Sequence, residues 1–154
     1  MRSATEPTGD DARIEPLSHS VTAVEPQRAV DTWPVFKPLI ERALAHGLGE
    51  ETTSNEILGL VASGEAQMWA IGKDGELRGV VVLSVNETST IRKVVIELLS
   101  GTRMADWVDE VEQLMLDFRD SVGAHCLEAS CRPGLAKRLG KRGWRRKAIT
   151  MELV

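Results

Sequence analysis

Residues 92–101 read Arg-Lys-Val-Val-Ile-Glu-Leu-Leu-Ser-Gly, and an amphipathic pattern at residues 104–122 follows them. Five large aliphatic side chains occupy the seven positions from Val94 to Ser100. Such a nearly continuous run is typical of a strand that is covered on both faces of a sheet. One carboxylate, Glu97, interrupts it. Because a helix is expected directly after the glycine turn, its first amides are predicted to point back at the strand end and to favour an anion there.

The composition predicts one globular domain. The chain has 154 residues, of which 42% are hydrophobic and 27% charged, and these values lie in the ordinary range. No run is long enough to span a bilayer, and the first residues lack the apolar segment of a signal peptide, so a cytoplasm is the expected location. Cys126 and Cys131 are expected to point to opposite faces of a strand and not to pair. The spacing of cysteines and histidines suggests no metal site.

Two regions stand apart in composition. Residues 1–19 are predicted to form a flexible arm, because they are rich in Pro, Gly, Ser, Thr and Asp and show no periodicity, and residues 20–154 form the domain. Residues 132–147 carry eight cations and no acid, although the net charge is −4. A solvated face is the favoured interpretation of this basic run. A site for a polyanion, either a nucleotide-bearing cofactor or nucleic acid, is the alternative.

Hydrophobic periodicity and turn signals predict ten elements. Proline should break a helix interior, so Pro34 is expected near the start of the main part of the first helix. The predicted elements are a strand at 20–24, helices at 28–45 and 52–64, strands at 67–71, 77–85 and 92–100, a helix at 104–122, a strand at 125–130, a helix at 133–143 and a strand at 144–154.

This order resembles the GNAT superfamily, the acyl-coenzyme A dependent N-acyltransferases. Its most specific local piece is the segment 135–144, which is similar to the family's late helix and turn. A narrower resemblance, to GNAT-like proteins encoded by tailed bacteriophages and prophages, is carried by Trp33, residues 64–69, Gly101 with Trp107, and residues 132–134. The resemblance implies an α/β (α+β) fold with a mixed, mostly antiparallel central sheet, helices on both faces and the order β-α-α-β-β-β-α-β-α-β.

The resemblance also implies a binding site for acetyl-CoA and no metal. In the family a bulge splays the fourth and fifth strands, which here are residues 93–99 and 125–130. The pantetheine arm would contact the backbone near Leu98 and Leu99. The pyrophosphate would lie on the amides of Gly101, Thr102 and Arg103 at the helix start. The adenosine phosphate would be held by Lys137 and Arg138.

Two departures from the family pattern bear on activity. A Q/R-x-x-G-x-G/A segment usually binds the pyrophosphate, whereas residues 99–104 here contain one glycine and offer fewer free amides. Many active members use a tyrosine to protonate the leaving thiolate. This chain has no tyrosine, and the matching positions are Leu139 and Gly140. Weak or lost N-acetyltransferase activity is therefore expected.

The base that such a reaction needs is predicted to be Glu97. Partial burial in an apolar strand disfavours the charged form of a carboxylate and so makes it a better proton acceptor. A structural role for Glu97, paired with Arg92 or Lys93, is the favoured alternative, and Glu128 on the next strand is a second candidate base. Cys131 has no recognisable histidine base and is expected to be a small buried thiol.

Three functions follow from these observations. The first is acetyl transfer from acetyl-CoA to an amine, with the acceptor read by the loop at residues 45–53. The second is a non-catalytic role as a phage virion or assembly component that binds phage structural proteins, which places the protein in the virion rather than the host cytoplasm. The third, nucleic-acid binding, is disfavoured because Trp144 is the one aromatic residue of the basic run.

Overall fold

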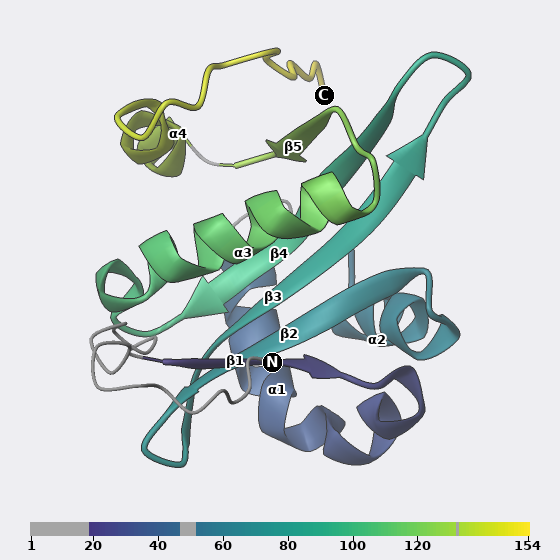
Figure 1. Ribbon diagram of the computed structural model, residues 1–154, viewed down its shortest axis with the longest axis vertical. Helices are drawn as coiled ribbons and strands as arrows, with labels where there is room; N and C mark the ends of the chain where they lie inside the picture. Colours follow the sequence, from purple (N-terminus) through teal and green to yellow (C-terminus); the bar gives the residue numbers. More distant parts are fainter. Residues whose placement is uncertain (1–18, 47–51, 132) are drawn as a thin grey trace, which may run out of the picture.

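The computed structural model describes residues 19–46, 52–131 and 133–154 (Figure 1). The predicted arm at residues 1–19 therefore lies outside the described residues except for His19, which is buried. The elements are β1 (Ser20–Val24), α1 (Pro26–His46), α2 (Ser54–Ser63), β2 (Ala66–Lys73), β3 (Glu76–Glu87), β4 (Arg92–Gly101), the 3-10 turn η3 (Met104–Asp106), α3 (Val108–Ser121), β5 (Cys126–Ala129) and α4 (Pro133–Gly140).

The five strands form one mixed sheet in the order β1-β2-β3-β4-β5. The pairs β1–β2, β2–β3 and β3–β4 are antiparallel, and β4–β5 is parallel. Figure 1 shows α3 in front of the sheet and α1 behind it. The predicted α/β class, with a mostly antiparallel sheet and helices on both faces, is confirmed.

Two apolar cores lie on the two faces of the sheet, and β3 serves both. Val80 and Val82 pack with α1 and α2, whereas Val81 and Leu83 pack with Trp107 and other residues of the α3 side. All four β3 side chains have no exposed surface. Successive residues of a strand point to opposite faces, so coverage of both faces requires a continuous apolar run.

Helix α1 corrects the prediction for Pro34. The helix continues through both Pro34 and Pro38. The two prolines are four residues apart and exposed, so they share the solvent side of the helix. The carbonyls of Val30 and Pro34, which lose their amide donors, therefore lie where water can reach them, and the helix need not break.

The predicted last strand is wrong: residues 144–154 form no strand, and the sheet ends at β5. One backbone bond, from the Trp144 amide to the Leu139 carbonyl at 3.1 Å, and two side-chain bonds attach this segment to the domain. The indole of Trp144 donates to Glu112 at 2.6 Å, and Lys147 donates to Glu128 at 2.7 Å. Because β5 has only four residues, it offers a short edge for a further strand.

Candidate functional site

A β-bulge at Glu97 organises the candidate site. Leu83 on β3 pairs with Ile96 on β4, but Val82 pairs with Leu98, so Glu97 is an extra residue without a partner on β3. A bulge of this kind bends its strand and re-aims a side chain. Glu97 accepts a hydrogen bond at 2.5 Å from the hydroxyl of Ser84, which lies on the Val82 face of β3. The Glu97 carboxylate therefore lies on the face of the sheet that α1 and α2 cover.

The pairing between β4 and β5 ends beside the bulge. Their pairing runs from Lys93 with Cys126 to Ile96 with Ala129 and stops there. From Glu97 onward, the β5-facing edge of β4 has no strand partner among the described residues. The structure thus contains the bulge in the fourth strand that the resemblance implied, and the parallel pairing ends beside it because β5 itself ends at Ala129. Leu98 is buried and Leu99 is half-buried on the unpaired stretch.

Glu97 does not have the surroundings that were expected of it. Its side chain is exposed rather than half-buried, because the bulge turns it out of the apolar run. Neither expected cation is its partner. Arg92 pairs with Glu87 at 2.8 Å, and Lys93 pairs with Glu128 at 2.9 Å. Glu97 is thus held by a neutral hydroxyl group and open to solvent.

Glu128, the second candidate base, lies between two cations. Hydrogen bonds from Lys147 and from Lys93 lower the pKa of Glu128 below its ordinary value. A carboxylate stabilised as an anion in this way is a poorer proton acceptor. The electrostatics therefore argue against Glu128 as a base. Cys131 is exposed and not buried as expected, and both cysteines are free.

The connection from β4 to α3 is tighter than a direct strand-to-helix turn. The amide of Thr102 donates to the carbonyl of Arg78 at 2.9 Å, and the Trp107 indole donates to the Thr102 carbonyl at 2.9 Å. Arg103 adopts a left-handed φ of 52° and pairs with Asp106 at 3.1 Å. The Thr102 amide is thus already bonded, and α3 begins only at Val108, because the 3-10 turn η3 intervenes.

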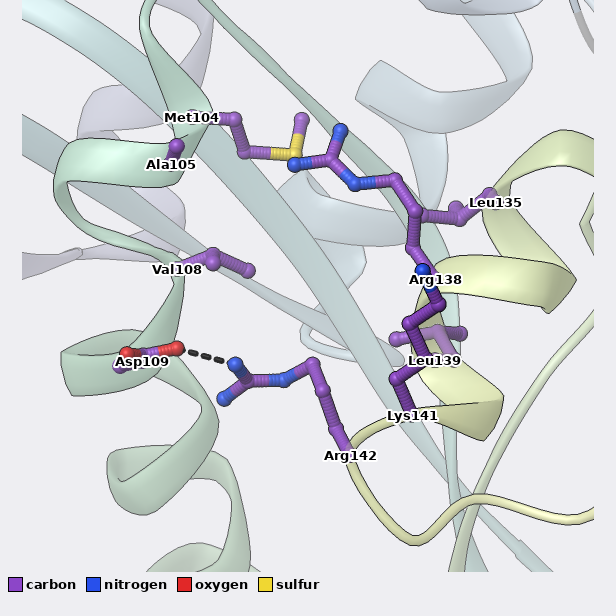
Figure 2. A pocket seen from close by; sticks show the side chains of 9 residues that line it. All are labelled: Met104, Ala105, Val108, Asp109, Leu135, Arg138, Leu139, Lys141 and Arg142. Carbon is purple, nitrogen blue, oxygen red and sulfur yellow. Dashed lines mark ion pairs between the residues drawn. The ribbon is translucent and has the colours of Figure 1, made fainter.

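A cleft lies between the start of α3 and α4, and we name it the α3–α4 cleft (Figure 2). Its volume is about 390 Å³. Figure 2 shows Arg138 reaching from α4 toward Met104 across the cleft. Arg138 and Lys141 have no acidic partner among the described residues. The cleft is lined by Met104, Ala105, Val108, Asp109, Leu135, Arg138, Leu139, Lys141 and Arg142.

The sequence pointed to this cleft only in part. Arg138, one of the two residues that the resemblance assigned to the adenosine phosphate, lines the cleft, whereas Lys137 does not. Lys141 and Arg142 were not singled out, although they follow Arg138 at three and four residues, which is the spacing of one helix face. The combination of apolar side chains with unpaired cations suits a ligand that has both a ring system and phosphate groups.

An ion-pair network fixes one wall of the cleft. Arg142 pairs with Asp109 and, at 2.5 Å, with Glu112, which also accepts from the Trp144 indole at 2.6 Å. Desolvation alone would raise the pKa of Glu112, but hydrogen bonds from Arg142 and Trp144 outweigh it and lower the pKa. We name these three residues, Glu112, Arg142 and Trp144, the α3 latch. They join α3 to the chain after α4.

Two further properties concern the described part of the chain. No three or more His, Cys, Asp or Glu side chains in it are grouped so that they could hold a metal ion. No helix in it combines the length and the apolar character that crossing a membrane requires.

The sequence matches no protein-family profile and no curated protein. Solved structures, however, share the fold. One is the ribosomal-protein-alanine N-acetyltransferase of Brucella melitensis, with a TM-score of 0.63, 12% identity and coverage of 88% of this chain and 97% of that one. An aminoglycoside N-acetyltransferase in complex with CoA has a TM-score of 0.61, 9% identity and coverage of 91% and 96%.

A predicted acetyltransferase of Clostridium acetobutylicum, solved with acetyl-CoA, has a TM-score of 0.63, 10% identity and coverage of 88% and 96%. These identities are low, so the likeness concerns the fold and not the activity. The order of the elements, the mixed sheet and the bulge in β4 beside the end of its pairing with β5 agree with it. The chain therefore has the GNAT fold of the acetyltransferases.

Proposed function

We propose that the protein binds acetyl-CoA and transfers its acetyl group slowly to an amine. The single observation that carries this proposal is the bulge at Glu97, which coincides with the end of β4–β5 pairing. An unpaired stretch of β4 and an accessible carboxylate thereby lie side by side. The solved structures of similar fold that hold CoA or acetyl-CoA support the choice of ligand.

The residues on the two sides of the bulge suit the parts of acetyl-CoA. The unpaired β4 edge at Leu98 and Leu99 would bind the pantetheine arm through backbone groups. Arg138 and Lys141 would bind phosphate groups in the α3–α4 cleft, where the apolar side chains suit an adenine ring. Gly101, Thr102 and Arg103 would close the site between these two regions, although the bonded Thr102 amide makes their contribution smaller than the resemblance implied.

Glu97 is the proposed base of the reaction. An amine bound as an ammonium ion must lose a proton before its nitrogen can act as a nucleophile, and the Glu97 carboxylate would accept that proton. When bound, acetyl-CoA supplies an activated acetyl group: a C–N bond forms at the thioester carbonyl, the C–S bond breaks and a thiolate leaves. Because the chain has no tyrosine, water would protonate the thiolate, and slow turnover is expected.

Substitution of Glu97 tests this assignment. We expect Glu97→Gln to lower kcat for an amine acceptor by about 10²-fold, because a general base typically contributes 10²–10⁴-fold, with the Kd for acetyl-CoA nearly unchanged. Glu128→Gln is the control, since Glu128 is already stabilised as an anion by two lysines. A parallel fall in kcat and affinity would make Glu97 structural. Acetyl-CoA binding without turnover on any amine would refute the transferase role while leaving the binding site intact.

A further inference from the structure

Residues 145–153 have the sequence of a strand but no strand to pair with. Ile149, Met151 and Leu153 alternate with smaller or polar residues, which is the period of a strand with one apolar face. Their exposed fractions are 71%, 88% and 99%. Large apolar side chains exposed together in this way mark an interaction surface. We name residues 145–153 the terminal strand segment.

The segment is held beside the sheet edge without joining the sheet. Lys147 pairs with Glu128 of β5 at 2.7 Å, and Trp144, immediately before the segment, is bound to Glu112 of α3. Figure 1 shows this part of the chain running near β5. No backbone ladder is formed, so its amide and carbonyl groups remain available to another strand.

The charges of the segment select one pairing. Arg146 and Glu152 are exposed and have no charged partner among the described residues. They lie symmetrically about Ile149, three residues before it and three after it. If two copies pair antiparallel about Ile149, each Arg146 lies opposite Glu152 of the partner subunit, and opposite charges in such cross-strand pairs are stabilising.

The same register also arranges the apolar residues. Residues directly opposite one another in an antiparallel pair share a face. About Ile149, odd positions meet odd positions, so Ile149 meets Ile149, and Met151 and Leu153 lie opposite the aliphatic stems of Lys147 and Arg145 on the same face. Arg146 and Glu152 lie on the other face. A shift of the register by one residue would pair odd with even positions and so put Ile149, Met151 and Leu153 of the two copies on opposite faces. Among the registers that keep the odd positions of both copies on one face, this one places each Arg146 opposite Glu152 of the partner subunit, so charge matching selects it.

We propose that the terminal strand segment is a dimerisation element that pairs antiparallel with the same segment of a second copy. The interface is isologous, because each copy uses the same surface. Only a second chain can place Glu152 opposite Arg146, since a straight strand cannot pair with itself. Pairing with β5 of the same chain would leave Glu152 unmatched, because the four residues of β5 are Cys-Leu-Glu-Ala and include no cation.

Charge exchange tests this register. We expect the full chain to sediment as a dimer at micromolar concentration. Arg146→Glu alone and Glu152→Arg alone should each raise the dimer Kd about tenfold or more, because each places like charges opposite one another at two symmetric positions. An equimolar mixture of these two variants should form a heterodimer with near wild-type affinity, since every cross-strand pair then again joins opposite charges.

The neighbouring Arg145 provides the control. Arg145→Glu makes the same change of charge at an exposed residue that would face Leu153 of the partner subunit, so mixing it with Glu152→Arg should not restore affinity. Sedimentation and light scattering measure both mixtures. A wild-type chain that stays monomeric throughout the micromolar range would overturn the proposal. So would a heterodimer of Arg146→Glu and Glu152→Arg that is no tighter than the control mixture.

Discussion

Two glycines on neighbouring strands decide how closely Trp107 can approach the sheet. A Cβ atom placed on Gly79 or on Gly101 would lie 2.6 Å from Cζ2 of the Trp107 indole. Real Cβ atoms do not tolerate contacts this short, so only glycine fits at either position. The indole in turn bonds to the Thr102 carbonyl and is buried. These glycines therefore fix the end of β4 beside the proposed binding site.

Gly101→Ala should consequently destabilise the fold. We expect the free energy of unfolding to fall by about 2–3 kcal/mol, because the new methyl group displaces Trp107 or the backbone of Gly79. Gly59→Ala in α2 is the control, since nothing lies within 4 Å of a Cβ there, and it should stabilise by about 0.5–1 kcal/mol. Urea unfolding of both variants provides the measurement. Equal effects at the two glycines would contradict the close packing of Trp107.

For the single residue Glu97, the sequence reveals the position but not the surroundings. A lone carboxylate in an apolar run is visible in the sequence, and it marks the position. The bulge is not visible, because it depends on the register between β3 and β4. Nor is Ser84, which is thirteen residues away and meets Glu97 only across that register. The partner and the exposure of Glu97 therefore required the structure.

At the scale of elements, the α3 latch ties α3 to the chain after α4 through Glu112. The folded-state pKa of Glu112 is lowered, so its contribution to stability is complete above the unfolded pKa of about 4.3. It is lost as the pH falls through the lower folded value, because the unfolded state then binds more protons. Arg142 remains charged throughout this range. The latch is therefore expected to open in acid.

Glu112→Gln tests the latch. We expect the variant to lose about 1 kcal/mol of unfolding free energy at pH 7, because a partly exposed charged network is broken. The difference from the wild type should shrink as the pH falls below about 4. Asp117→Asn, on the same helix and bonded to the neutral Gln113 at 3.0 Å, is the matched control. A wild-type advantage that does not change down to pH 3 would contradict the assignment.

Element types and order, the helix α1 included, were largely predictable, but the place of the prolines within α1 and the conformation of residues 144–154 were not. In both cases a rule that considers only neighbouring residues gave a wrong prediction. Proline at 34 and 38 should end a helix, yet both fall on the solvent side of α1, and a single sequence does not show which side faces water. Residues 144–154 have a strand pattern, but a strand also needs a partner edge, and pairing is a property of the whole fold.

At the scale of the whole molecule, the acidic α3 and the basic run after it partly neutralise one another. Arg142 and Lys147 are in ion pairs with α3 and β5. Arg138 and Lys141 instead line the α3–α4 cleft without acidic partners in the described part of the chain. The basic run is thus partly neutralised by ion pairs, and a site for a polyanion at Arg138 and Lys141 stays a proposal. The phage origin and the virion role stay predictions, as does the reading of the acceptor by residues 45–53, of which 47–51 lie outside the described residues.

Calorimetric titration with acetyl-CoA tests the central claim, which is that the unpaired stretch of β4 at the bulge and the α3–α4 cleft form one binding site. We predict saturable binding with a micromolar Kd and a Kd about tenfold higher for Arg138→Glu, because a phosphate-binding cation becomes an anion. Lys37→Glu, at an exposed position on α1, is the control and should bind as the wild type does. Absence of binding at millimolar ligand, or equal affinity of Arg138→Glu and the wild type, would contradict the account.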